Sequence, residues 1–119
     1  MRIISFIVIP LTLLAIILIV SLGFILPKQR KDEMEQFTTC ENLFKEGKYQ
    51  EAVPLLEDFI KDHGRSQKKA DAYYYLAKSN EELKNYDMAM EIWEKIIKDH
   101  AKSDYISEAY YYVGLNHER

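Results

Sequence analysis

The chain has 119 residues, and all 19 acidic side chains lie at Asp32 or later, together with 12 of the 16 basic ones. An acidic surface repels phosphate backbones, which argues against nucleic acid as a partner. The segment after Asp32 can bury one modest hydrophobic core at most, which excludes a multidomain enzyme.

The first predicted element is a membrane-spanning helix over residues 3–26. This stretch is rich in Ile, Leu, Val and Phe and has no charged residue. A hydrocarbon core about 30 Å thick needs roughly 20 helical residues. We therefore predict a transmembrane anchor over residues 1–27, which contacts the membrane through residues 3–26, and a basic juxtamembrane linker over residues 28–32.

The alternative to an anchor is a cleaved secretory signal. Arg2 fits such a signal, and Ser21 with Gly23 could mimic a cleavage site. The apolar run of a signal has about 7 to 15 residues, however, and this run is longer. A lipoprotein signal is disfavoured because Cys40 lies too far beyond the run. We therefore favour the uncleaved anchor.

Residues 33–119 contain an internal repeat. A shift of 37 residues places residues 49–63 over 86–100 and residues 72–77 over 109–114. Apolar side chains return at intervals of three and four, which indicates helices rather than strands.

We therefore predict an all-α fold in which an N-terminal transmembrane helix precedes a helical-hairpin solenoid. The predicted helices are two pairs, at about 33–46 with 49–63 and at about 69–84 with 86–100, and a single terminal helix from about 104. The repeats then span about 33–68 and 69–105, with a partial repeat over 106–119.

Turn residues separate the predicted helices. Gly47 and Lys84 stand at equivalent places and mark tight turns inside the two pairs, while His63 and His100 open looser turns after them. Pro54 lacks a backbone donor, so it either lies near the start of its helix or bends it locally.

These residues resemble the tetratricopeptide repeat, whose paired helices cross at small side chains. Small residues of the first helix are matched by Ala77 and Gly114, and those of the second helix by Ala52 and Ala89. Trp93 matches the large position, with Leu56 as its counterpart. Small side chains let the two backbones approach, and the large one fills the space that the crossing opens.

Some residues depart from the family pattern. Cys40 stands at the small crossing position of the first unit, Asn80 replaces a usual aromatic residue, and the period exceeds the family's by three residues. Such longer units resemble the repeats of bacterial envelope proteins, such as the outer-membrane assembly lipoprotein and the Tol–Pal coordinator.

The resemblance implies a protein-binding groove lined by the first helix of each pair. The positions that it transfers to this sequence are Phe37, Glu41, Phe44, Lys45, Asp71, Tyr74, Lys78, Glu81, Glu82, Glu108, Tyr111 and Leu115. Exposed aromatic rings at these positions would be anchors for a peptide. Alternatively, Tyr74 and Tyr111 pack between neighbouring pairs.

Nothing in the sequence predicts catalysis, a cofactor or a metal site. Glycine-rich phosphate loops, zinc-ligand spacing and a nucleophile elbow are all missing. His63 and His100 are one whole repeat apart, and we expect them to contact the last carbonyls of their helices instead. We expect Cys40 to be a small buried residue and not a nucleophile.

We therefore predict a single-pass membrane protein, not an enzyme, that docks another protein or peptide as a scaffold or adaptor in a cell-envelope assembly. Lys28, Arg30 and Lys31 favour a cytoplasmic repeat domain. Arg2, the terminal amine and the envelope resemblance favour the extracytoplasmic (periplasmic) side, which we prefer. The alternatives are a cytosol-facing regulatory adaptor and a structural subunit that forms homo-oligomers through its C-terminal helix.

Overall fold

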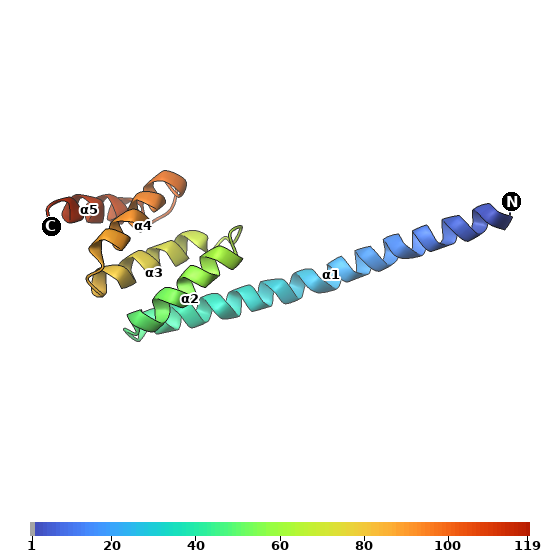
Figure 1. Ribbon diagram of the computed structural model, residues 1–119, viewed down its shortest axis with the longest axis horizontal. Coiled ribbons are helices and arrows are strands. Elements are labelled where there is room, and N and C mark those ends of the chain that lie inside the picture. Colours follow the sequence, from blue (N-terminus) through green and yellow to red (C-terminus); the bar gives the residue numbers. More distant parts are fainter. Residues whose placement is uncertain (1) are drawn as a thin grey trace. The chain divides into compact units, whose positions relative to one another are not determined.

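The computed structural model describes residues 2–119, with the side chains of all of these except residues 2–9 and 24–27. Within this part of the chain the regular elements are all helices, shown in chain order in Figure 1. Their bounds are α1 Arg2–Lys45, α2 Tyr49–Asp62, α3 Lys69–Glu82, α4 Tyr86–Asp99 and α5 Ile106–His117. The predicted all-α repeat fold is confirmed.

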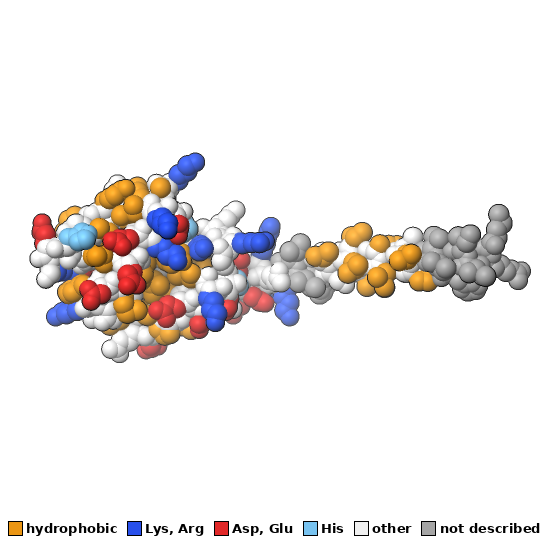
Figure 2. Space-filling model, turned by 45° about the horizontal axis from the view of Figure 1, so that its top comes forward, with side chains coloured by type: hydrophobic (Ala, Val, Ile, Leu, Met, Phe, Trp, Pro, Cys, Tyr) orange, Lys and Arg blue, Asp and Glu red, His pale blue; other side chains and the backbone are white. Residues whose placement is uncertain are grey.

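The chain divides into two compact units, Met1–Met34 and Glu35–Arg119, and α1 runs through both. The predicted linker over residues 28–32 is therefore helical. In the first unit, residues 10–23 are all exposed, and the face seen in Figure 2 shows hydrophobic side chains along this unit. The two ends of the predicted span, residues 3–9 and 24–26, lie outside the described side chains.

The core of the second unit consists of two clusters of buried side chains. The first cluster comprises Phe37 and Cys40 of α1, Ala52, Leu56 and Phe59 of α2, and Ala72 and Leu76 of α3. The second comprises Tyr73 and Ala77 of α3, Ala89, Trp93 and Ile96 of α4, and Ala109 of α5. Because α3 contributes to both clusters, it joins the first helix pair to the second.

The small residues lie where the paired helices meet, as predicted. Ala52, Ala77 and Ala89 are fully buried, and Cys40 takes the equivalent place in α1 at 1% exposure. Burial raises the pKa of the Cys40 thiol, so the thiolate is disfavoured. Gly114 differs, because it is exposed and a Cβ built on it would meet nothing within 4 Å.

Both tight turns end their first helix with the same backbone motif. Gly47 has φ 74° and Lys84 has φ 62°, so both lie in the left-handed region. In each turn the backbone N–H of the left-handed residue donates to the carbonyl oxygen three residues earlier. The N–H of the next residue donates to the carbonyl oxygen five residues earlier. These second bonds are Lys48 N to Leu43 O at 2.9 Å and Asn85 N to Asn80 O at 2.8 Å. These paired bonds satisfy the last helical carbonyls.

The two helix-end histidines occupy the predicted positions, but the expected side-chain contacts are wrong. His63 and His100 terminate α2 and α4 through their backbone N–H groups. Instead, Nε2 of His63 lies 2.8 Å from the side-chain oxygen of Gln36. The His100 ring packs against the Tyr73 ring, with the two centroids 5.5 Å apart. Packing within each pair therefore decides where these rings point.

Pro54 is the sixth residue of α2 and lies inside the helix. The backbone acceptor that loses its bond is four residues earlier, on Gln50. Both residues are exposed, so water can satisfy that carbonyl.

The two turns give a stability prediction. We expect Lys84→Gly to raise the free energy of unfolding by about 1 kcal/mol, because glycine removes the Cβ clash of the left-handed conformation. Urea unfolding of the full chain in detergent, followed by circular dichroism, measures the change. The matched control, Gly47→Lys, should lower the value by a similar amount. A Lys84→Gly variant less stable than the original chain would contradict this account.

Candidate protein-binding surface

The twelve predicted groove residues lie on three first helices, namely residues 35–45 of α1, then α3 and α5. We call the surface that these residues form the first-helix surface. Polar side chains on it reach from one first helix to the next, and most of them are half-buried. The structure therefore engages many of the predicted residues in contacts within the chain.

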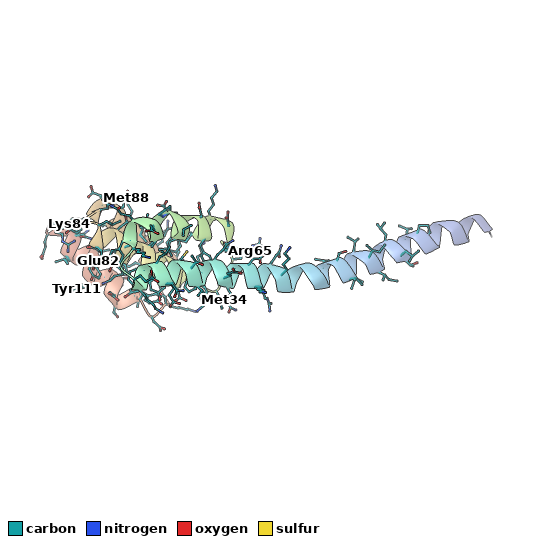
Figure 3. All side chains as sticks on the ribbon, turned by 90° about the horizontal axis from the view of Figure 1, so that it is seen from below. Met34, Arg65, Glu82, Lys84, Met88 and Tyr111 are labelled. Carbon is teal, nitrogen blue, oxygen red and sulfur yellow. The ribbon has the colours of Figure 1, made fainter. Side chains whose placement is uncertain are left out.

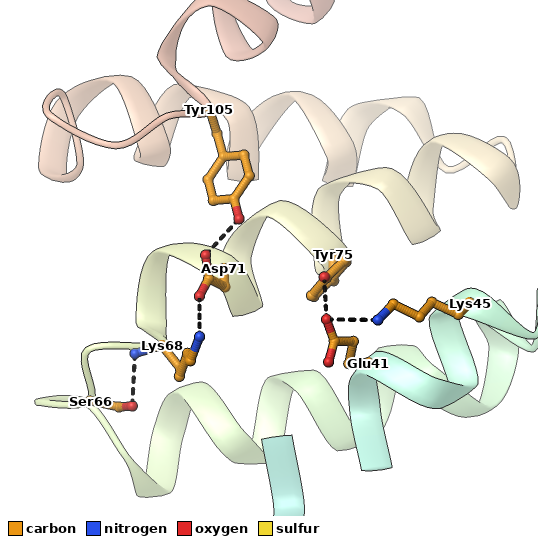
Figure 4. A network of polar contacts seen from close by, with 7 residues as sticks. All are labelled: Glu41, Lys45, Ser66, Lys68, Asp71, Tyr75 and Tyr105. Carbon is orange, nitrogen blue, oxygen red and sulfur yellow. Dashed lines mark hydrogen bonds and ion pairs between the residues drawn. The ribbon is translucent and has the colours of Figure 1, made fainter. Parts of the chain in front are cut away.

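The first of these contacts joins α1 to α3. The Tyr75 hydroxyl donates to Oε1 of Glu41 at 2.8 Å, and Lys45 lies 3.1 Å from the same oxygen (Figure 4). The Tyr75 hydrogen bond, followed by that of Lys45, lowers the pKa of Glu41. Burial and then the Glu41 bond raise the pKa of Tyr75 to about 12.

A similar contact joins the start of α3 to the residue before α5. The Tyr105 hydroxyl donates to Asp71 at 2.5 Å, and Lys68 lies 3.3 Å from the other oxygen of that carboxylate (Figure 4). Burial and the bond to Asp71 raise the pKa of Tyr105. Asp71 is thus held between two repeats.

The next contact, between α3 and α5, has the opposite polarity. Lys78 occupies the place of Glu41 one repeat later, and it donates to the Tyr112 hydroxyl at 2.7 Å. Lys78 also lies 3.3 Å from Glu108. Burial lowers the pKa of Lys78, but its bonds to Tyr112 and Glu108 outweigh this and raise the pKa. The same tyrosine position therefore donates in one repeat and accepts in the next.

Glu81 is the most buried carboxylate of the first-helix surface, with 9% exposure. Its carboxylate accepts hydrogen bonds from the side chains of Asn116, in α5, and Arg119, just after α5, at 2.7 Å each. Burial of a carboxylate is costly unless hydrogen-bond partners such as these compensate for the lost water. Glu81 therefore links α3 to the end of the chain.

The aromatic residues of the surface divide into packed and exposed rings. Phe37 is buried at 4% exposure and contacts Phe59, so it belongs to the core. Phe44 is half-buried, and its ring centroid lies 4.8 Å from that of Tyr75. Tyr74 is half-buried and stacks on Tyr105, with the ring centroids 4.2 Å apart. This contact matches the alternative prediction that Tyr74 packs between neighbouring pairs.

Tyr111 is the exposed aromatic residue of the predicted set, with 63% exposure. Lys45 and Glu82 are exposed as well, and Leu115 is half-buried (Figure 3 labels Glu82 and Tyr111). Two surface cavities, of about 290 and 230 Å³, are lined by none of the twelve predicted residues. The side chains most available to a partner are therefore Lys45, Glu82 and Tyr111.

Sequence reasoning missed the bridging partners Tyr75, Tyr105 and Tyr112. Each of their hydrogen bonds spans 34 residues, which is the 37-residue repeat less about one helical turn. A search for complementary polar residues at that separation would have found all three bonds.

The Tyr75 bond predicts a dependence of stability on alkaline pH. A raised pKa means that the folded state holds the phenol proton more tightly, so stability is complete below pH 10 and is lost as pH rises toward 12. We expect Tyr75→Phe to lose about 1 kcal/mol of unfolding free energy at neutral pH and to show a shallower alkaline decline. Urea unfolding at several pH values measures both effects. Tyr110→Phe, at an exposed ring, is the control, and an equal alkaline slope for Tyr75→Phe and the original chain would refute the role of this bond.

Comparison with known proteins agrees with this geometry. The family model described as tetratricopeptide repeat matches residues 71–103, which cover most of α3, all of α4 and the following turn. No curated protein matches the chain. The match to residues 71–103 supports the tetratricopeptide repeat family.

Proposed function

We propose that the chain is a membrane-anchored scaffold that docks a protein component of a larger cell-envelope assembly. Tetratricopeptide repeats are typically interaction scaffolds without catalytic activity, and the match to residues 71–103 supports that class of function. The proposed partner is a protein or peptide that contacts the first-helix surface.

The observation that carries the proposal is the apolar helix of the first unit. Nine Leu, Ile and Val side chains between Leu11 and Leu22 are each 52–68% exposed. Removing one such side chain from water is worth about 1.5–3 kcal/mol. A lipid bilayer would cover all of them at once, and the helix is long and apolar enough to cross it.

Anchoring would also serve the docking function. A domain confined to the membrane plane meets a partner in the same membrane at a raised effective concentration. A weak contact through a few exposed side chains then suffices for assembly. Exposed Tyr111 of α5 would supply contact area, and exposed Lys45 of α1 and Glu82 of α3 would supply charge.

The proposed location of the repeat domain is the extracytoplasmic side of the membrane. The resemblance of the long repeats to envelope proteins supports this location, and Arg2 can hold the short N-terminal end inside. Lys28, Arg30 and Lys31 oppose it by the positive-inside rule. Orientation therefore needs a direct measurement.

The docking proposal predicts position-specific crosslinking in intact cells. A photoreactive amino acid at Tyr111 or Glu82 should capture one protein reproducibly, because both side chains are exposed on first helices. Matched controls at Arg65 and Met88, which are exposed on the turn after α2 and on α4, should not capture it (Figure 3). Gels and mass spectrometry identify the products. Equal capture from all four positions would contradict docking at the first-helix surface.

The location proposal predicts the behaviour of a reporter fused after Arg119. A fluorescent protein that matures only in the cytoplasm should stay dark, whereas an enzyme that is active only outside the cytoplasm should be active. Exchanging Lys28, Arg30 and Lys31 for glutamine should leave this result unchanged. A bright cytoplasmic reporter would place the repeat domain on the cytosolic side and reject the proposed location.

A further inference from the structure

The two helix-end histidines stand one repeat apart but have different surroundings. In the first pair, Nε2 of His63 lies 2.8 Å from Oε1 of Gln36. An amide oxygen can accept an imidazole N–H whether the ring is neutral or protonated. The first pair therefore offers His63 a partner in both of its protonation states.

The second pair offers His100 no such partner. Tyr73 stands one repeat after Gln36, and its ring packs against the His100 ring. Nε2 of His100 is buried, and no side chain or backbone group of the described residues hydrogen-bonds to it. Oγ of Ser103, in the same turn, is buried and unpaired in the same way. Buried polar atoms without partners lower the stability of a structure, so this turn is a weak point of the second unit.

Positive charges already surround this site. Nζ of Lys69 lies 5.9 Å from the centroid of the Tyr73 ring, and Nζ of Lys95 lies 5.6 Å from it. A proton on His100 would add a third positive charge beside the same ring, where like charges repel. Asp99 of α4 favours the proton, but burial of His100, followed by the charge of Lys69, keeps the pKa of His100 below its usual value.

The turn that starts at His100 also fixes the start of α5. Ser103 donates its backbone N–H to the His100 carbonyl at 2.9 Å. Two residues later, the Tyr105 ring stacks on Tyr74, and its hydroxyl donates to Asp71. A displacement of the His100 ring therefore disturbs the contacts that join the start of α5 to α3.

We propose that protonation of His100 opens the turn between α4 and α5 and so loosens the attachment of α5 to the second helix pair. The protonated ring has two N–H donors, and the buried one has no acceptor among the described residues, so the charged ring is more stable in water than in its site. Helix α5 is thus closed near neutral pH and opens in acid. This response is a property of the fold, and it does not depend on the function proposed for the first-helix surface.

Proton linkage gives the sign and the size of the effect. The open turn exposes His100 to water, where a histidine has its usual pKa of about 6.5. The closed turn holds the pKa lower. The neutral ring therefore stabilises the closed turn fully above about pH 7.5, and this stability is lost as the pH falls through about 6.5. Because opening takes up one proton, the open population rises by at most about tenfold for each pH unit.

The test is hydrogen exchange of the full chain in detergent micelles at pH 7.5 and 5.5, followed by mass spectrometry of its fragments. After correction for the chemical exchange rate, residues 101–117 should exchange about two- to tenfold faster at pH 5.5. Residues of α2 should keep the same protection at both pH values. Unchanged protection of residues 101–117, or an equal loss of protection in α2, would overturn the proposal.

Variants assign the response to one ring. His100→Phe and His100→Gln cannot take up a proton, so residues 101–117 should be equally protected at both pH values in each variant. Phenylalanine keeps an apolar ring beside Tyr73 and glutamine does not, so a loss of the pH response in both cannot come from a change in stability. His63→Phe, the matched control one repeat earlier, should keep the response of the original chain. His117 is present in every variant and cannot account for a difference. A response that survives in either His100 variant, or that disappears in His63→Phe, would show that His100 is not the group responsible.

Discussion

The fold of the second unit depends on helices that cross at small side chains. Ala77 faces a helix that carries Ala89 and Trp93, and all three are fully buried. The alanines allow the two backbones to approach, and the indole fills the space that the crossing opens. Since α3 packs with α2 on one side and α4 on the other, each crossing also sets the position of the next helix. Asn80 is fully buried nearby, where its side-chain amide donates to the Leu76 carbonyl at 2.9 Å.

A second set of interactions couples the first helices across that core. Tyrosines of one repeat bond to charged residues of the repeat before, and the charge changes from Glu41 to Lys78 without loss of the contact. A phenol hydroxyl can donate to a carboxylate or accept from an ammonium group, which explains why one tyrosine position suits both. This coupling occupies much of the first-helix surface and leaves Tyr111 exposed.

The helices α1 and α5 of the second unit differ in the polarity of the residues that they expose. At the α1 end, polar Glu35 and Thr39 replace the residues that pack between pairs, so water can cover that face. At the α5 end, Tyr110 and Gly114 retain the residue types of a covered face. The two helices therefore differ in these exposed residues, which are polar on α1 and aromatic or small on α5.

The sequence alone determined the all-α class, the 37-residue repeat and the bounds of α2 to α5 to within two residues. It did so because helical periodicity, the Gly47 and Lys84 turns and the small crossing residues are local signals that recur one repeat later. It divided α1, however, into two helices with a linker over residues 28–32, where the structure has one continuous helix. Tertiary structure decided which groove residues stay accessible. Phe37 is buried in the core and Glu81 is hydrogen-bonded, while Tyr111 is exposed, because exposure depends on which neighbouring helix covers a position. Such coverage joins residues of different helices that are far apart in the sequence, and no local pattern records it.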